Sequence, residues 1–274
     1  MKYLAHTRDG TIEFNVPTYR DGKILSEHEG NLLAVEIAQA TIADGAVVEL
    51  GGLPMRSPAE IKAGGRMPTT DEIREFYDMI ATPRKGDGWF GSTQHIDKSF
   101  GRTQYALKHI EPGMSIMEAG CADGGLSQHL VEAVGPDGFT TLIDISSVFV
   151  ARAEPFVLGR NPGAKIEFVV GDAAEYKTRR RYDVIVAMEI LEHVVDPRKL
   201  ISSLFGLLRK DSGKIIVSVP TGVEDALGEH LYEFSEEDVS VILGDATGLH
   251  VSTEVIGSTI FAIVDKKRAV PYVR

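Results

Sequence analysis

The feature that most constrains the fold is a glycine-rich turn between a short apolar run and a helical pattern, in the sequence SIMEAGCADGG at residues 115–125. The apolar run predicts a buried strand. The following LSQHLVEAV places Leu126, Leu130 and Val134 on one helical face. Glycines let the chain turn tightly and approach a ligand, and the first amides of a helix are free to bind one. The stretch therefore predicts a strand, a turn and a helix that can hold a ligand.

From about residue 106 onward, apolar runs alternate with helical patterns. The predicted parallel strands end near Glu118, Asp144, Asp172, Glu189 and Pro220. Helices are expected from Ser147 to about Leu158, from Pro197 behind an Asp196 cap, and from Ser235. HVSTEVI and TIFAIVDK, separated by Gly257 and Ser258, predict a final antiparallel pair. The pattern is typical of an α/β fold with a doubly wound, mostly parallel sheet.

Four successive predicted strands end in an acidic residue, and these are Glu118, Asp144, Asp172 and Glu189. Ligands of doubly wound sheets bind beyond the carboxyl ends of the strands, so the four acids are expected at one binding edge. An acid after the second strand suits a ribose diol, and one after the third suits the amino group of adenine. Glu118 and the turn carbonyls can meet a cationic group. The implied ligand contains a ribose, an adenine and a positive centre.

At this point the chain resembles the class I S-adenosylmethionine-dependent methyltransferases. Their acid-x-Gly-x-Gly-x-Gly motif is matched by Glu118, Gly120 and Gly124, with Ala122 in place of the middle glycine. MEILEHVVDP at residues 188–197 and the later HLYEFSEEDV resemble segments of the branch that includes ubiquinone-biosynthesis O-methyltransferases. The resemblance covers roughly residues 106–267.

The resemblance implies a Rossmann-like methyltransferase fold, with a seven-stranded sheet whose last strand is antiparallel. It also implies S-adenosylmethionine as cofactor, S-adenosylhomocysteine as product, and in-line attack of an acceptor nucleophile on the sulfonium methyl group. The residues expected to bind the cofactor are Glu118, Gly120, Cys121, Ala122, Gly124, Asp144, Ile145, Asp172, Ala173, Met188 and Trp89.

His193, His230 and Glu189 are the candidate catalytic residues, because an acceptor hydroxyl must lose its proton. A packing or capping role is the alternative for each histidine. No metal is predicted, although Glu189, Glu192 and His193 with a distant histidine also resemble the metal site of small-RNA 3′-terminal 2′-O-methyltransferases. A metal-dependent RNA methyltransferase and a non-catalytic cofactor-binding module are therefore the rival functions.

Residues 1–65 do not follow this pattern and predict a small α+β appendage of unknown role. A hairpin is expected around Asp9-Gly10, then a helix from Ser26, a strand at residues 46–50, and a loop punctuated by glycines up to Gly65. Its role is a lid, a packing flap or the contact of a homodimer. Residues 66–105 predict a lead-in helix followed by a segment in which Trp89 either anchors a loop or belongs to a lid over the ligand. Residues 106–274 predict the cofactor-binding domain.

Composition narrows the range of partners. The net charge of −11 argues against a nucleic-acid partner. Cys121 is the one cysteine, which excludes an intramolecular disulfide and predicts a small packing residue rather than a nucleophile. No apolar stretch is long enough to span a bilayer, and the first residues do not resemble a signal peptide, so a cytoplasmic location is expected. The predicted function is methyl transfer to a hydroxyl or other heteroatom of a small molecule or sugar.

Overall fold

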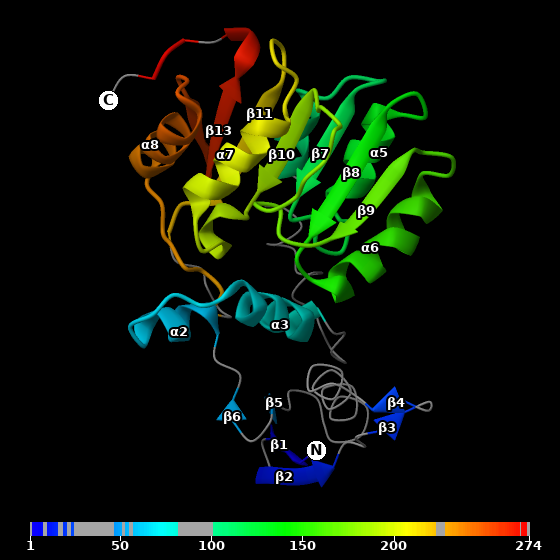
Figure 1. Cartoon of the computed structure of the whole chain (residues 1–274), viewed down its shortest axis with the longest axis vertical. Coiled ribbons are helices and arrows are strands. Elements are labelled where there is room, and N and C mark those ends of the chain that lie inside the picture. The colour runs from blue at the N-terminus through cyan, green and yellow to red at the C-terminus, as the bar shows by residue number, and fades with distance from the viewer. Residues whose placement is uncertain are drawn as a thin grey trace.

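The computed structural model describes residues 57–81, 101–222, 228–268 and 270–272, together with the backbone of short strands between residues 2 and 54. Its centre is a seven-stranded sheet (Figure 1). The strands are β7 (Ser115–Ala119), β8 (Phe139–Asp144), β9 (Ile166–Val170), β10 (Val184–Met188), β11 (Lys214–Pro220), β12 (Ser252–Ile256) and β13 (Thr259–Asp265). Their order is β12-β13-β11-β10-β7-β8-β9. β7 to β11 pair in parallel and β13 is antiparallel to both neighbours, which confirms the predicted sheet.

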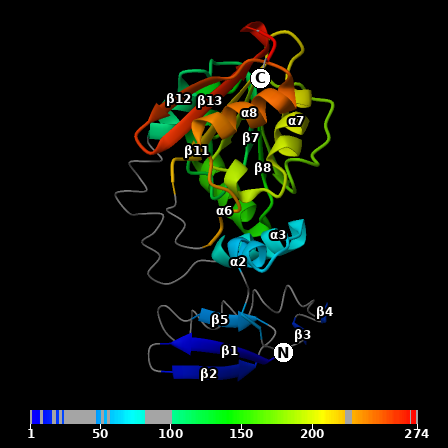
Figure 2. The same ribbon diagram turned by 90° about the vertical axis from the view of Figure 1, so that its left-hand side faces the viewer.

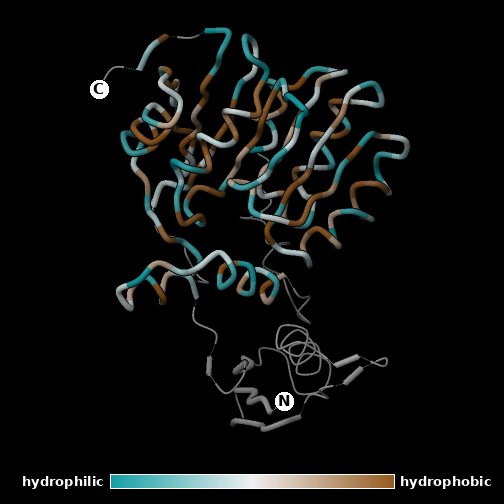
Figure 3. Tube along the Cα trace, in the orientation of Figure 1, coloured by the Kyte–Doolittle hydropathy of each residue, from teal (hydrophilic) through white to brown (hydrophobic). Residues whose placement is uncertain are grey.

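Helices cover both faces of this sheet. They are α5 (Ser127–Val134), α6 (Ser147–Arg160), α7 (Pro197–Leu207) and α8 (Glu236–Thr247), with 3₁₀ turns η1 (Leu191–His193) and η2 (Lys266–Arg268). α7 and α8 share one apolar core with one face of the sheet, while α5, α6 and the helical residues 101–107 pack on the other (Figures 1 and 2). Figure 3 shows that hydrophobic residues concentrate in the strands between these layers. The central strands are buried on both faces, as expected for a parallel sheet, whereas the edge strands β9 and β12 are more exposed.

The order of the strands creates a crevice at one edge. β7 lies between β8, which follows it in the sequence, and β10, which is the third strand after it. The connections from β7 and from β10 therefore leave the sheet toward opposite faces. At such a switch point the two loops separate and leave room for a ligand beyond the carboxyl ends of the strands.

Two helices before the sheet lie across this edge, α2 (Pro58–Ala63) and α3 (Thr70–Ala81) (Figures 1 and 2). α3 is the predicted lead-in helix, and a cap precedes it, because Thr69 and Glu72 exchange hydrogen bonds. The loop expected up to Gly65 is wrong for residues 58–63. Ser57 and Glu60 form a capping box there, which starts a short helix at Pro58.

The strands described before residue 55 are β1 (Lys2–Thr7), β2 (Gly10–Asn15), β3 (Tyr19–Arg20), β4 (Lys23–Ile24), β5 (Val47–Leu50) and β6 (Leu53–Pro54). β1 and β2 form the predicted hairpin, with Thr7 opposite Gly10. The strand predicted at residues 46–50 is β5. The helix predicted from Ser26 lies outside the described residues, and the appendage's role stays a prediction. Among the described residues, no helix has the length and apolarity that a bilayer crossing requires.

Candidate active site

A cavity of about 1570 Å³ lies beyond the carboxyl ends of the parallel strands. All four predicted strand-tip acids line it: Glu118, Asp144, Asp172 and Glu189. α3 closes the opposite side with Ile73, Tyr77 and Ile80, which recur at helical spacing. The cavity therefore combines a charged floor with an apolar wall, the composition expected of a small-molecule site.

The glycine-rich turn leads from β7 into α5 through backbone conformations that favour glycine. Gly120 and Gly124 have φ values of +80° and +88°, and a Cβ at Gly124 would lie 2.8 Å from a methyl carbon of Val157. Ala122, which replaces the middle glycine, adopts φ +44° as well. Its amide donates to Asp144 Oδ2 at 2.9 Å, which helps to hold this strained conformation.

Asp144 is fixed from both sides at the end of β8. Oδ2 accepts from Ala122, and Oδ1 accepts the amide of Ser146 at 2.9 Å. The side chain is largely buried, and this burial raises the pKa of Asp144 to about 6, although the backbone hydrogen bonds act in the opposite direction. The carboxylate is thus oriented before any ligand binds, with lone pairs left to accept hydroxyl hydrogens.

Glu118 is buried behind the turn, where Ser127 Oγ donates to its Oε2 at 2.5 Å. Burial raises the pKa of Glu118 to about 8, more than the hydrogen bond from Ser127 lowers it. Cys121 is also buried, among Val131, Leu142 and other side chains between the sheet and its helices. Burial raises the pKa of the Cys121 thiol well above its usual range, as expected of a packing residue rather than a nucleophile.

The remaining predicted cofactor residues occupy the same cavity. Asp172 Oδ1 accepts the amide of Ala174 at 2.8 Å, so its carboxylate is held in the loop after β9. Ile145, Ala173 and Met188 line the wall beside it. Trp89 lies outside the described residues, so its contact with a ligand stays a prediction.

Glu189 stands at the tip of β10 with φ +50°, a rare conformation for a residue with a side chain. Its Oε1 accepts from Ser218 Oγ at 2.8 Å, and its Oε2 lies 2.9 Å from a guanidinium nitrogen of Arg102. Both carboxylate oxygens therefore already have protein partners. Such local strain is common at functional sites, and the contacts show how the fold sustains it.

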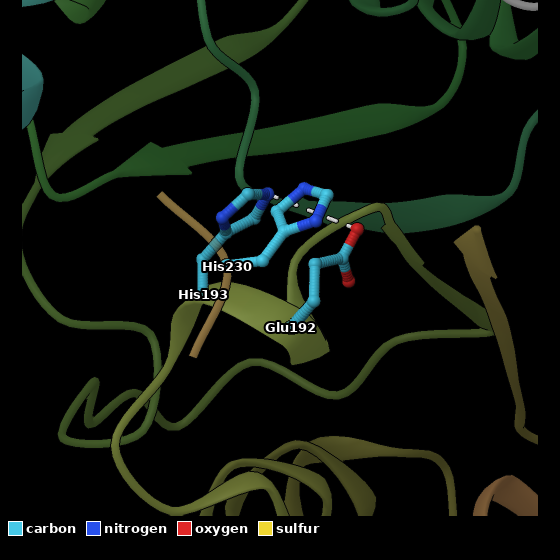
Figure 4. Close-up of side chains that lie close together, drawn as sticks. All are labelled: Glu192, His193 and His230. Atoms are coloured by element: carbon cyan, nitrogen blue, oxygen red, sulfur yellow. Dashed lines mark ion pairs between the residues drawn. The ribbon is translucent and has the colours of Figure 1, made fainter. Parts of the chain in front are cut away.

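Glu192, His193 and His230 come together beside this strand tip (Figure 4). His193 Nε2 lies 3.7 Å from Glu192 Oε1, and the two imidazole rings are 4.8 Å apart between centroids. One ligand atom from each residue lies within 4.8 Å of the other two. The structure thus joins two predicted catalytic histidines, which are 37 positions apart in the numbering, to an acid beside them.

The carboxylate of Glu192 has an unusual environment. Its side chain is 1% exposed, and in the described part of the chain neither oxygen has a hydrogen-bond partner. Burial raises the pKa of Glu192 well above its usual range, and the negative charge of Glu189 raises it further. A buried carboxyl without hydrogen bonds is costly, so the site favours a proton or a positively charged partner there.

Sequence reasoning did not identify Arg102, Ser127 and Ser218, which hold the strand-tip acids. It also did not assign a role to Asp78 of α3. No local motif marks these residues, because each contacts a residue that the fold brings to it from another element.

Comparison with known proteins fits this geometry. Residues 96–245, more than half of the chain, match the model of a methyltransferase domain family. The chain is 34% identical over 122 residues to the ubiquinone biosynthesis O-methyltransferase of Coxiella burnetii, covering 41% of this chain and 48% of that protein. The Aliivibrio fischeri enzyme of the same description is 28% identical over 151 residues. The chain spans about half the length of these curated relatives.

Solved structures share the fold at low identity. Magnesium protoporphyrin IX methyltransferase from Synechocystis, with bound S-adenosylmethionine, is 18% identical with a TM-score of 0.57, covering 74% of this chain and 99% of that one. An N-methyltransferase from Bradyrhizobium japonicum, with bound S-adenosylhomocysteine, is 17% identical with a TM-score of 0.54, covering 70% of this chain and 97% of that one. The chain thus belongs to the class I S-adenosylmethionine-dependent methyltransferases, and the predicted family and fold are confirmed.

Proposed function

We propose that this protein transfers the methyl group of S-adenosylmethionine to a hydroxyl or other heteroatom of a small molecule or sugar. The observation that carries the proposal is that one cavity holds both the glycine-rich turn with Asp144 and the His193–His230 pair. A ligand anchored at the turn would extend toward the tip of β10, where the histidines lie. Binding and proton transfer thus have separate residues within one space.

The residues at the turn fit the cofactor. Asp144 is pre-oriented to accept ribose hydroxyls, and Asp172 lies after β9, where the adenine amino group is expected. Glu118 and the turn carbonyls are the candidates for the ammonium group. When bound, S-adenosylmethionine supplies an electrophilic methyl group on a sulfonium centre, so the protein itself needs no nucleophile.

The chain's own residues then have three tasks: to orient the acceptor, to exclude water and to accept a proton. His193 Nδ1 lies 3.3 Å from the carbonyl oxygen of Glu229, and its Nε2 is directed toward Glu192. An imidazolium formed when His193 accepts the acceptor's proton would be stabilised by the carboxylate of Glu192. Ile73 and Tyr77 of α3 supply the apolar wall that excludes water.

A small acceptor fits this site better than RNA does. The net charge of −11 disfavours binding through phosphate contacts. The wall that α3 places over the cavity suits an organic ring or a sugar that is buried on binding. The two ubiquinone-biosynthesis relatives are named for O-methylation of a small molecule, which supports a hydroxyl as the accepting group.

The test has two stages. Calorimetric titration with S-adenosylhomocysteine first establishes the cofactor, with micromolar binding as the expected result. The protein is then incubated with methyl-labelled S-adenosylmethionine and panels of phenols, catechols, sugars, amines and short RNAs, and labelled products are identified by mass spectrometry. Labelling of hydroxyl compounds supports the proposal. If the cofactor binds but only RNA becomes labelled, the result would favour an RNA methyltransferase. If the cofactor binds but no panel gives a labelled product, the result would favour a non-catalytic cofactor-binding module.

A second candidate is metal-assisted methylation of a hydroxyl, and the Glu192, His193 and His230 cluster favours it. The donor set fits a divalent transition metal, because it combines two imidazoles with a carboxylate whose oxygens have no hydrogen-bond partner among the described residues. The metal would act as a Lewis acid on the acceptor oxygen. The cluster therefore gives a reason to test a metal that the sequence analysis did not predict.

Manganese titration followed by calorimetry separates the two candidates. Metal-assisted transfer requires manganese binding that His230→Ala abolishes, while His109→Ala, outside the cavity, leaves it unchanged. It also requires turnover that a chelator removes. If turnover persists in the presence of the chelator and manganese does not bind, metal-assisted transfer is excluded. His193 is then the candidate proton acceptor.

A further inference from the structure

Asp78 connects α3 to the cofactor corner of the cavity, although it lies outside residues 96–245 that match the family model. Its side chain is 1% exposed. Oδ1 accepts from Ser146 Oγ at 2.6 Å and from the amide of Val148 at 3.3 Å, with Ser147 Oγ at 3.5 Å. Asp78 thus receives hydrogen bonds from the first residues of α6.

Ser146 stands between two acids. Its hydroxyl donates to Asp78, and its amide donates to Asp144 Oδ1 at 2.9 Å. Asp144 is the acid that faces the cavity and holds the glycine-rich turn. A continuous chain of hydrogen bonds therefore runs from α3 through Ser146 to the residue expected to bind the ribose.

The position of Asp78 at the amino end of α6 is electrostatically favourable. The amino end of α6 carries a partial positive charge, which stabilises a carboxylate placed against it. Burying a carboxylate costs free energy, and an apolar residue could fill the same space without that cost. The carboxylate of Asp78 is therefore expected to do more than pack. At the end of α3, Arg152 of α6 donates to the carbonyl of Ala81 at 2.7 Å. α3 is thus bound to α6 at two points by polar contacts.

These contacts decide where the apolar wall stands. Tyr77 precedes Asp78, and Ile73 and Ile80 lie on the same face of α3 as Tyr77. When Asp78 is bound to α6, this face lies over the cavity. If the bond were lost, both the wall and the orientation of Ser146 would relax.

We propose that Asp78 is a positioning residue for the cofactor: it fixes α3 over the site and, through Ser146, orients Asp144. The inference rests on the proposed function, because it assigns Asp78 to the site that would hold S-adenosylmethionine. It goes further by making α3 part of the cofactor site.

The same arrangement has an electrostatic signature. Asp78 on α3 raises the pKa of Asp144 by charge repulsion, in addition to the larger effect of burial. Among the described residues, Glu118 on β7 and Cys121 in the turn also interact electrostatically with Asp144. An ionised Asp144 accepts ribose hydroxyls better than a protonated one. Affinity should therefore fall as pH drops through about 6, and removing the charge of Asp78 should move this fall to lower pH.

The experiment measures the affinity for S-adenosylhomocysteine by calorimetry between about pH 5 and pH 8, with wild type and Asp78→Asn. We expect Asp78→Asn to bind about 10-fold more weakly at pH 8, the scale of a lost hydrogen bond to a charged group. Its loss of affinity in acid should begin at a lower pH than in wild type. Asp71→Asn is the matched control, because Asp71 lies on the same helix and pairs at the surface with Arg74, at 2.7 Å. It should bind as wild type does.

A second variant tests the route through Ser146. Ser146→Ala keeps the amide but removes the hydroxyl, so it should also weaken binding. If both residues act through one route, the double variant that combines Asp78→Asn with Ser146→Ala should have the same affinity as the single variant that binds more weakly. Unchanged affinity in Asp78→Asn, an unchanged pH dependence, or losses that multiply in the double variant would each overturn the proposal. Absence of binding by wild type would instead refute the proposed function together with this inference.

Discussion

Two buried carboxylates at the same edge of the sheet have opposite surroundings. Asp144, at the end of β8, accepts a backbone amide at each oxygen. Glu192, in η1 after β10, has no hydrogen bond to either oxygen within the described part of the chain. Both are almost fully enclosed. The half of the cavity around Asp144 and the half around Glu192 therefore differ in how completely the protein hydrogen-bonds its own buried carboxyl groups.

The difference indicates two kinds of binding. A carboxylate held by fixed amides is oriented in advance and can select a neutral ligand by hydrogen bonding. A carboxyl without such partners is balanced by a proton or a positive charge, and this balance can change during a reaction. We therefore expect the half of the cavity around Asp144 and the glycine-rich turn, the cofactor half, to bind the cofactor. We expect the half around Glu192, His193 and His230, the acceptor half, to carry proton or metal chemistry.

The largest expected effect tests the role of His193 in the acceptor half. His193→Ala should lower turnover with the acceptor by about 10²–10⁴-fold, the usual contribution of general acid–base catalysis. Affinity for S-adenosylhomocysteine should stay nearly unchanged. His250→Ala, at an exposed position before β12, is the control. Full turnover of the His193 variant would remove this residue as the base.

Glu118 provides a test of burial in the cofactor half. Its pKa is raised to about 8, so the folded state holds a proton that the unfolded state releases above its usual pKa of 4.5. The stability of the free protein should therefore decrease as pH rises from 4.5 to 8, by up to ~4 kcal/mol from this group. Glu118→Gln should remove this slope in urea unfolding measured across that range. An unchanged slope would show that Glu118 is ionised in the folded protein.

Asp144 and Glu192 can be compared directly as ligand-binding groups. Asp144→Ala should weaken binding of S-adenosylhomocysteine by about 1.5–3 kcal/mol, because it removes a charged acceptor. Glu192→Gln should leave that affinity unchanged, since Glu192 belongs to the acceptor half. Calorimetry on both variants decides the point. Equal losses would mean that the two halves are not separate.

The smallest expected effect concerns the turn itself. Gly124→Ala should destabilise the protein by about 1–2 kcal/mol, because φ is +88° and the added Cβ would meet Val157 at 2.8 Å. Gly159→Ala in α6 is the matched control, since a Cβ there meets nothing within 4 Å. Thermal melting should show a loss for the first variant only. Equal stability would show that the turn adapts to a side chain.

Much of the cofactor half could be predicted because its signals are local. Alternating apolar runs predicted the sheet with its antiparallel last strand, and the glycine spacing predicted the turn. The acids after successive strands were expected to meet, since parallel strands end at one edge. In the structure Glu118, Asp144, Asp172 and Glu189 all line the cavity. Their individual roles remain predictions.

The acceptor half depended on contacts between distant segments. Nothing local indicated that the Glu192 carboxyl would be buried without a hydrogen bond from the described residues, or that the His230 and His193 ring centroids would lie 4.8 Å apart. The partners of Glu189, which are Arg102 and Ser218, come from separate elements as well. Helix α2 was missed because proline and glycine were interpreted as loop signals, although Ser57 and Glu60 had the spacing of a capping box.

The sequence by itself determined the class of fold, the edge that binds ligand and the acids that reach it, because periodicity and turn chemistry act over a few residues. Only the tertiary structure decided which groups hydrogen-bond to each of those acids, and that Glu192 has no hydrogen bond to either oxygen within the described residues. It also placed Asp78 of α3 beside Ser146 and brought His230 to Glu192. The physical reason is that burial, charge repulsion and hydrogen-bond partners depend on how distant segments pack together, and no local pattern records that packing.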